Sequence, residues 1–296
     1  MEVKPEEGYK GLDLLESAMR RKKKVRLDTK KLAWPTVGKL EIKKLYVKYR
    51  QNLPNVLKNI SLSIKPGTKV GIVGRTGAGK TALISSIYRT FDEYRGEIKI
   101  DGKEIRTIDL KILRNTMTII PQDPYLFNDT LRNNMDPTHQ FDEEVIEELL
   151  NEVNLWEKFT YLNGLDSKIE AGGSNLSQGE KQLVCLARAL LFNNKLVLMD
   201  EATANIDTQT EAIIQRLIKE KFNKSTFDDR SPTQHHPPLR QVKRLILFDF
   251  NFFDRVLLLD GGKVLEYDDL HNFMGNEKSH FGRMLMKSNA IQESLR

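Results

Sequence analysis

A glycine-rich run near residue 75 has the composition of a phosphate-binding loop. It follows a short apolar stretch at 69–73 and precedes a helix expected at 82–89. Glycines allow a tight turn that points successive backbone N–H groups at phosphate oxygens, and a helix N-terminus adds a favourable dipole. Lys80 is expected to reach the β- and γ-phosphates, and Thr81 to bind Mg²⁺ through its hydroxyl. The run fits the P-loop pattern at every fixed position and reads Gly74-Arg75-Thr76-Gly77-Ala78-Gly79-Lys80-Thr81.

Two adjacent carboxylates follow a later apolar run. Leu196–Met199 is expected to form a buried strand, and Asp200 and Glu201 come directly after it. At the carboxyl edge of a parallel sheet, Asp200 is predicted to be a Mg²⁺ ligand. Glu201 is predicted to polarise the attacking water as a general base. Many strands end in acidic residues, so the pair indicates a hydrolytic site only in combination with the P-loop.

The segment 176–180, called here the signature segment, opens a helix that is expected to include residues 183–191. Ser177 and Gly179 lie at the start of this helix. A hydroxyl and free backbone N–H groups at such a position can cap the helix, and they can also bind an anion. The segment by itself favours the capping interpretation. Its position shortly before the carboxylate strand favours anion binding.

Taken together, these motifs resemble the nucleotide-binding domain of an ABC transporter. More narrowly, they resemble the second such domain of the multidrug-resistance-associated, or C, subfamily. The resemblance is dense over residues 36–222 and resumes at 253–266. The broader match rests on the order of five motifs: the P-loop, Pro121-Gln122-Asp123, the signature segment, 198–201 and 204–207. The finer match to the C subfamily rests on residues 47–50, 127–137, 182–191 and 201–205.

The resemblance implies a role for each matching position, with ATP and Mg²⁺ as ligands. Tyr49 matches the aromatic residue that stacks on adenine. Gln122 matches the glutamine that contacts Mg²⁺ and the attacking water. Ser177 and Gly179 match the residues that bind the γ-phosphate of ATP held by a different domain, and Asp207 matches the loop that connects the two sites. The predicted catalytic residues are Lys80, Gln122 and Glu201, and the predicted Mg²⁺ ligands are Thr81, Gln122 and Asp200.

The resemblance also implies partners, because two such domains sandwich two ATP molecules head to tail. A second nucleotide-binding domain, in a homo- or heterodimer, and membrane-spanning domains are therefore expected. An ATPase that drives solute export is the first hypothesis, and an ATP-gated clamp with little hydrolysis is the second. A non-transport ATPase acting on DNA or ribosomes is the third. The short gap between Thr81 and Asp200 has no sustained heptads, so a nucleic-acid partner is not expected.

The sequence departs from the family pattern in two places. Glu180 stands where the family usually has a glutamine. The family's histidine, about nine residues before Asp254, would fall at Leu245, and no histidine is there. That histidine would orient the catalytic water, so its loss puts the rate of hydrolysis in question. His235 and His236 lie upstream in a proline-rich stretch, which favours an exposed loop over a replacement.

The predicted fold is α/β: a P-loop NTPase core with a parallel sheet, an antiparallel β subdomain and a helical insertion. Residues 1–38 are expected to be a basic linker or juxtamembrane segment, and 281–296 a C-terminal tail. The ATP-binding domain is placed at 39–280, with the helical subdomain at about 123–190 and a divergent segment at 223–253.

Composition limits the setting in which the chain works. Hydrophobic residues make up 39% and charged residues 30%, which is typical of a globular protein. No apolar run approaches the roughly 18 residues of a membrane span, and no secretory leader opens the chain. Residues 1–50 hold 15 Lys/Arg against 7 Asp/Glu, whereas the other residues hold 32 against 34. With Cys185 as its single cysteine, the chain is expected in the cytosol or at a cytosolic membrane face. The resemblance to a transporter domain implies the cytoplasmic face of a membrane.

Overall fold

The computed structural model describes residues 34–91, 93–200, 207–221 and 253–286. They form two compact units. The first, called here the sheet unit, comprises the described residues of 34–119, 194–200 and 218–286. The second, the helical unit, comprises 120–193 and 207–217. In the part of the chain that the structure describes, no helix is long and apolar enough to cross a bilayer.

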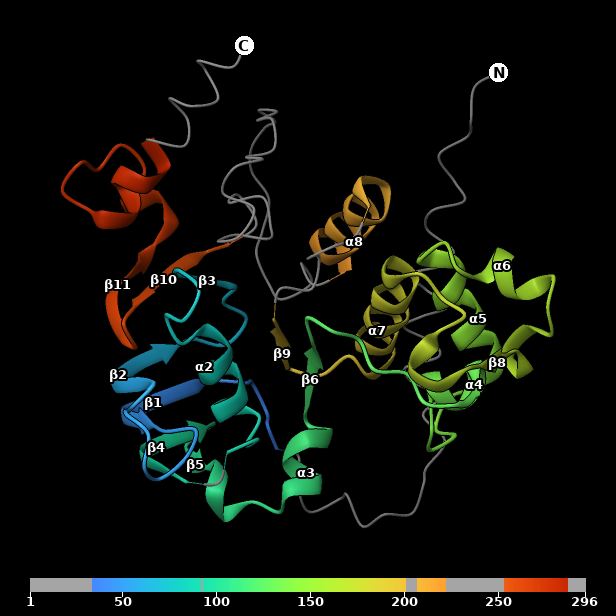
Figure 1. Ribbon diagram of the computed structural model, residues 1–296, viewed down its shortest axis with the longest axis horizontal. Coiled ribbons are helices and arrows are strands. Elements are labelled where there is room, and N and C mark those ends of the chain that lie inside the picture. The colour runs from blue at the N-terminus through green and yellow to red at the C-terminus, as the bar shows by residue number, and fades with distance from the viewer. Residues whose placement is uncertain (1–33, 92, 201–206, 222–252, 287–296) are drawn as a thin grey trace. The chain divides into compact units, whose positions relative to one another are not determined.

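An antiparallel sheet forms one part of the sheet unit (Figure 1). Its strand order is β2-β1-β4-β5, and β1 pairs with both β2 and β4. Leu40 and Ile42 alternate onto the buried face of β1, and after a register shift Leu45 and Val47 resume the alternation. The strands are β1 (Leu40–Val47), β2 (Leu57–Ile64), β4 (Tyr94–Ile100) and β5 (Lys103–Glu104).

A second sheet has the order β11-β10-β3. β3 (Val70–Val73) runs parallel to β10 (Arg255–Asp260), which forms a hairpin with β11 (Lys263–Asp269). The sequence predicts this hairpin from residues 256–260, a turn at Gly261-Gly262 and residues 263–266, and it predicts a strand at 69–73; both predictions are confirmed. β3 leads through the P-loop into α2 (Lys80–Ile87), which begins two residues before the predicted helix.

The core of the sheet unit lies between α2 and the strands. Leu83, Ile84 and Ile87 of α2 share one buried cluster with Ile98 of β4 and Leu257 of β10. Several short elements complete the unit, and β6 pairs with β9 in a further two-stranded sheet. They are η2 (Ile105–Thr107), α3 (Leu110–Asn115), β6 (Met117–Ile120), β9 (Leu196–Met199) and η6 (Leu270–Asn272).

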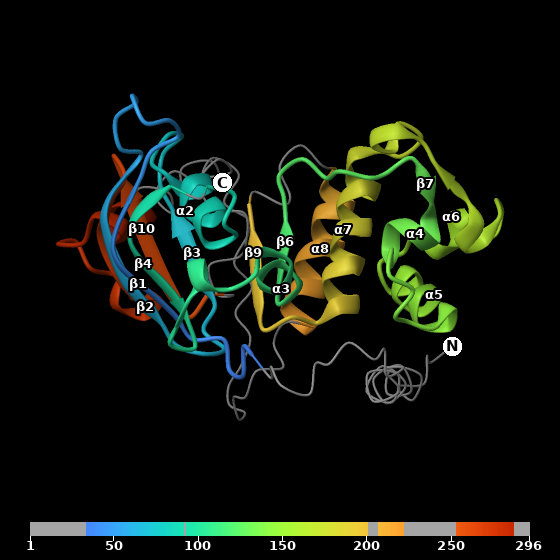
Figure 2. The same ribbon diagram turned by 90° about the horizontal axis from the view of Figure 1, so that it is seen from below.

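The helical unit contains the predicted helical insertion. Its longest described helix is α7 (Gln178–Phe192), which begins in the signature segment, and α5 packs against α7. Figure 2 shows α7 beside α8 (Thr208–Lys221). The remaining elements are β7 (Asp129–Thr130), α4 (Leu131–Met135), α5 (Glu143–Glu152), α6 (Trp156–Thr160), η3 (Gly164–Asp166), β8 (Lys168–Ile169) and η4 (Ala171–Gly173).

The described residues reach beyond the predicted domain limits at both ends. Trp34 is only 8% exposed, and its Nε1 donates a 2.9 Å hydrogen bond to the carbonyl of Ile100. At the other end Phe281 is fully buried, and its N–H donates to the carboxylate of Glu266. Residues 34–38 and the start of the predicted tail therefore pack on the sheet unit. The rest of the predicted linker and tail, at 1–33 and 287–296, lies outside the described residues.

Candidate nucleotide-binding site

The P-loop adopts a turn that requires glycine at two positions. Gly77 has a φ of 82° and Gly79 a φ of 106°, values that residues other than glycine rarely adopt. Gly79 is the N-cap of α2 and has no side chain with which to cap the helix. The first-turn N–H groups of α2 are therefore available to an anion rather than to a capping side chain.

Two glycines of the loop are also required by close packing. A Cβ on Gly74 would lie 2.5 Å from the carbonyl oxygen of Leu259 on β10. A Cβ on Gly79 would lie 2.7 Å from Cδ2 of Leu57 on β2. Both ends of the loop thus lie directly against neighbouring strands, β10 and β2. These contacts fix the loop between the β11-β10-β3 sheet and the β2-β1-β4-β5 sheet.

Lys80 lies on the loop that precedes it. Its Nζ donates a 2.8 Å hydrogen bond to the carbonyl of Gly74, six residues earlier. This bond holds a positive charge beside the backbone turn. A fixed ammonium next to oriented N–H groups is the arrangement that binds adjacent phosphates.

Thr81 and Asp200 meet at the end of β9. Thr81 Oγ1 donates a 3.3 Å hydrogen bond to Asp200 Oδ1. Burial raises the pKa of Asp200, while the hydrogen bond from Thr81 and the charge of Lys80 lower it, and the net shift is upward. A cation bound at this carboxylate would offset the cost of burying its charge.

These two oxygens fit the chemistry of Mg²⁺, which prefers hard oxygen ligands and usually binds through one or two protein groups plus phosphates. Among the residues that the structure describes, no three His, Cys, Asp or Glu side chains cluster as a metal site. Two protein oxygens suit an ion whose other ligands come from a nucleotide and water. Glu201, the predicted general base, lies outside the described residues.

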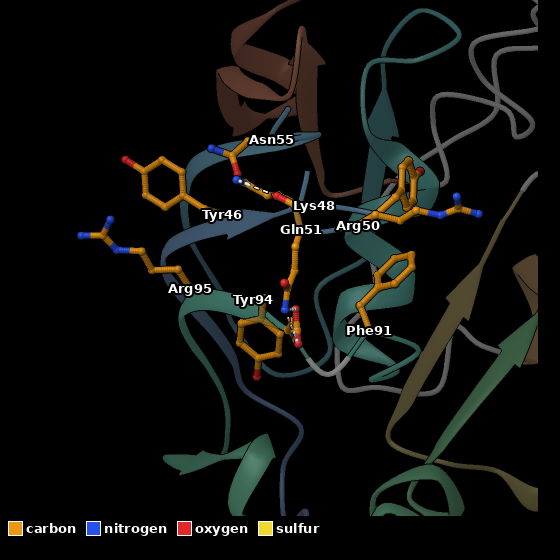
Figure 3. A pocket seen from close by; sticks show the side chains of 10 residues that line it. Tyr46, Lys48, Arg50, Gln51, Asn55, Phe91, Tyr94 and Arg95 are labelled. Atoms are coloured by element: carbon orange, nitrogen blue, oxygen red, sulfur yellow. Dashed lines mark hydrogen bonds between the residues drawn. The ribbon is translucent and has the colours of Figure 1, made fainter. Parts of the chain in front are cut away.

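Tyr49 is exposed and positioned by a second ring. It is 49% exposed, and its ring meets Phe91 edge to face with centroids 5.3 Å apart at 66°. Gln51 Nε2 donates to both carboxylate oxygens of Glu93, each at 3.2 Å. Figure 3 shows this region, where a surface pocket is lined by Tyr46, Lys48, Tyr49, Arg50, Gln51, Asn55, Phe91, Glu93, Tyr94 and Arg95.

The signature segment lies in the helical unit, where Ser177 is the N-cap of α7. Ser177 Oγ accepts a 3.2 Å hydrogen bond from the N–H of Glu180, whose carboxylate accepts one of 2.7 Å from the N–H of Ser177. This reciprocal capping box confirms the helix-start prediction. Ser177 is exposed and Gly179 is buried. Asp207 is exposed, and its Oδ1 accepts a hydrogen bond from the N–H of Thr210 in α8.

Gln122 is exposed, and its backbone is held by a residue that the sequence analysis did not select. Gln182 Nε2 donates to the carbonyls of Pro121 and Gln122, at 3.1 and 2.9 Å. Gln182 is only 1% exposed. A polar residue within the buried stripe of α7 was the signal that could have identified this anchor.

The structure brings together Lys80, Thr81 and Asp200 in the sheet unit, which also carries Tyr49. Gln122, Ser177 and Gly179 belong to the helical unit. A glycine turn between a strand and a helix, with a lysine on the turn and a hydroxyl–carboxylate pair beside it, defines a P-loop nucleotide-binding domain.

The comparisons with known proteins identify the family. The family model for the ABC transporter matches residues 57–204, half of the chain. The ATP-binding protein/permease VMR1 of Saccharomyces cerevisiae is 41% identical over 277 residues, covering 88% of this chain and 16% of the relative. ABC transporter C family member 8 of Dictyostelium discoideum is 37% identical over 262 residues, with the same shares. The chain belongs to the ABC transporter family and is an ATP-binding domain of it.

A solved structure agrees with this assignment. A bacterial Atm1-family ABC exporter with ATP bound has a TM-score of 0.68 and 26% identity, covering 84% of this chain and 41% of the exporter chain. Domains of this family are generally ATPases and bind ATP, in general with Mg²⁺. The chain spans 16% of the length of the VMR1 relative, which therefore contains much more than this domain.

Proposed function

We propose that this chain binds Mg²⁺-ATP at the P-loop and hydrolyses it to drive solute export. The observation that carries the proposal is the hydrogen bond of 3.3 Å between Thr81 and Asp200, beside a P-loop that already holds Lys80. Lys80 binds the β- and γ-phosphates, and Thr81 and Asp200 supply oxygen ligands to Mg²⁺. Tyr49 offers an exposed ring on which adenine stacks. Arg75, Thr76 and Ala78 contribute the backbone N–H groups of the loop.

Hydrolysis requires a water that attacks the γ-phosphate in line with the leaving oxygen. Glu201, which follows Asp200 directly, accepts the proton of this water, and Gln122 contacts the water and the ion. When bound, Mg²⁺ neutralises charge that develops on the phosphate oxygens. Ser177 and Gly179 at the start of α7 bind the γ-phosphate of an ATP held by a second domain, so each chain provides half of each site.

The partners follow from this division of the site. A second nucleotide-binding domain, in a homo- or heterodimer, completes the sandwich, and membrane-spanning domains are moved by its closing and opening. The domain then works at the cytoplasmic face of a membrane. A relative in Candida glabrata, 41% identical over 277 residues, is called a pleiotropic ABC efflux transporter of multiple drugs, which supports export as the direction of transport.

One observation favours a second candidate function, an ATP-gated clamp with little hydrolysis. The position expected for the water-orienting histidine is Leu245, within the predicted divergent segment 223–253. Residues 222–252 lie outside the described part of the chain, and so do His235 and His236. Without that histidine, ATP binding and closure remain while turnover falls.

Single-turnover hydrolysis of ATP separates the two candidates. The full chain and its Glu201→Gln variant are mixed with Mg²⁺-ATP at protein concentrations high enough for self-association. We expect turnover in the parent that the substitution abolishes. Tight ATP binding without turnover in either protein would instead support the clamp. Salt-sensitive binding of duplex DNA would support the non-transport ATPase.

A further inference from the structure

The start of α7 carries a carboxylate next to the place where the proposed function requires a phosphate. Glu180 is the third residue of α7, and its Oε2 accepts a hydrogen bond of 2.7 Å from the N–H of Ser177. Ser177 Oγ in turn accepts from the N–H of Glu180. An anion that approaches the Ser177 hydroxyl therefore meets a negative charge within the same helical turn.

The cap itself does not need this charge. A capping box takes Glu or Gln at the third position, because an amide oxygen accepts the N–H of the N-cap residue as a carboxylate does. Glutamine is also the residue that the family usually has at this position. The charge of Glu180 is therefore unfavourable for phosphate binding unless another group compensates it.

Lys158 of α6 is placed to provide this compensation. Its Nζ lies 2.8 Å from Oε1 and 2.9 Å from Oε2 of Glu180, although the two residues are 22 positions apart. Burial raises the pKa of Glu180, but the Lys158 ammonium and the N–H of Ser177 lower it more, so the carboxylate is ionised at neutral pH. The side chains are 39% and 26% exposed, and such a pair adds little to folding stability. Its local effect is to cancel the charge of Glu180.

The surroundings of the helix start make this cancellation important. A Cβ on Gly179 would lie 3.3 Å from Oδ2 of Asp207, so a second carboxylate borders the same turn. Lys181 follows Glu180 directly in the sequence, but its side chain lies beside Gly173. A Cβ built on Gly173 would lie 3.1 Å from Cε of Lys181. Lys158 is the cation that contacts Glu180 directly.

We propose that Lys158 is a positioning residue for the signature segment. By neutralising Glu180, it keeps the Ser177 and Gly179 end of α7 receptive to the γ-phosphate of ATP bound to the partner domain. The proposal rests on the proposed function of that segment. In this chain, Glu180 stands where the family usually has a glutamine, and the positive charge of Lys158 compensates for the negative charge of Glu180.

The test measures ATP-dependent self-association of the full chain by sedimentation, in the hydrolysis-suppressed Glu201→Gln background. Lys158→Met is expected to weaken the association roughly tenfold, the effect of one uncompensated charge near a phosphate. Lys158→Arg is expected to keep it. When Glu180→Gln is also present, Lys158→Met is expected to change it by less than about twofold. Calorimetric ATP affinity of the monomer, which reports on the P-loop, is expected to be the same in all variants.

The comparison of the two backgrounds decides the outcome. If Lys158→Met weakens the self-association equally with Glu180 and with Glu180→Gln, Lys158 has a structural role and the proposal is overturned. The absence of any loss would also overturn it. If the parent binds ATP but does not self-associate, the homodimeric form of the proposed sandwich fails, and the inference about Lys158 in that homodimer fails with it. Normal ATP affinity with a Lys158 effect that depends on Glu180 supports both.

Discussion

Thr81 and Asp200 are 119 positions apart in the chain, yet their side chains are hydrogen-bonded. Their residue types and the P-loop pattern predicted that both are Mg²⁺ ligands, because this ion takes hydroxyl and carboxylate oxygens beside phosphates. The contact between the two side chains agrees with that prediction. Gln182 was not predicted, since its role depends on which carbonyls α7 approaches, and no local pattern encodes that. The same holds for Phe91, whose contact with Tyr49 arises only in three dimensions.

Asp200 is expected to lower the stability of the protein without nucleotide. Burial raises its pKa, so folding favours the protonated form, and the ionised carboxylate costs stability as the pH rises through the folded pKa. Asp200→Asn should raise the melting temperature at pH 7 by about 1–3 °C, and this gain should shrink as the pH falls through the pKa of Asp200. Differential scanning calorimetry measures the gain.

The same substitution should remove Mg²⁺-dependent tightening of ATP binding, which titration with and without the ion detects. Asp260→Asn is the matched control, because Asp260 is an exposed carboxylate at the end of β10 in the same unit. A variant with unchanged Mg²⁺ dependence would exclude Asp200 as a ligand.

Tyr49 is expected to contribute through its ring and not through its hydroxyl. Tyr49→Ala should weaken ATP affinity roughly tenfold, the usual loss when a base loses an aromatic partner, whereas Tyr49→Phe should leave it within about twofold. Inorganic triphosphate has no base, so its affinity should not change. Competition titrations with both ligands check this, and equal losses for ATP and triphosphate would contradict stacking.

Among the helices and strands, the elements with regular apolar periodicity agree with the sequence analysis. β1 and β2 lie where alternation predicts them, and the β10–β11 hairpin lies where an apolar run followed by Gly261-Gly262 predicts it. The start of α7 at Gln178 was predicted from the Ser177 cap and not from hydrophobicity, because its apolar run begins only five residues later. The start of α2 was missed by two residues. The packing of residues 34–39 was also missed, since it depends on contacts with a turn more than 60 positions away.

Asp101 in the turn between β4 and β5 holds that segment. Its Oδ2 accepts from the N–H groups of Thr36, Val37 and Gly38, and its Oδ1 from that of Lys39 at 2.7 Å. Burial raises the pKa of Asp101, but these backbone hydrogen bonds lower it more. Because the folded pKa is depressed, the stabilisation is present at neutral pH and is lost as the pH falls through the folded pKa.

Asp101→Asn is therefore expected to destabilise the chain by about 1–2 kcal/mol at pH 7, a range already reduced for the partial exposure of the site. Urea unfolding monitored at pH 7 and again at acidic pH measures the difference, which should decrease in acid. Asp260→Asn, at the exposed end of β10 next to the β10–β11 turn, should change stability by less than about 0.5 kcal/mol. A loss that is independent of pH would contradict the role of the ionised carboxylate.

At the scale of the whole molecule, the P-loop and the signature segment belong to different units. The sheet unit carries the P-loop, and the helical unit carries the signature segment. Under the proposed function each chain provides half of each site, so it would hydrolyse ATP only when two domains meet.

The specific ATPase activity should therefore rise with protein concentration, and not stay constant as for a monomeric enzyme. We expect a roughly quadratic increase in rate below the dimer dissociation constant, measured by phosphate release over a dilution series at saturating Mg²⁺-ATP. Ser177→Ala should shift the curve to higher concentration while leaving monomer ATP affinity unchanged. A rate that is strictly proportional to concentration would contradict the shared site.

The fastening of residues 34–39 has a mechanical consequence. If the chain before Trp34 is pulled, the tension passes first to the Trp34 indole and to the hydrogen bonds of Asp101, at the turn that ends β4. These bonds share the load before it reaches the ladder between β1 and β4, which begins at Leu40 opposite Ile100. The contacts therefore deliver this force to the end of β4, and β1, which Tyr49 follows in the chain, is loaded only after they break.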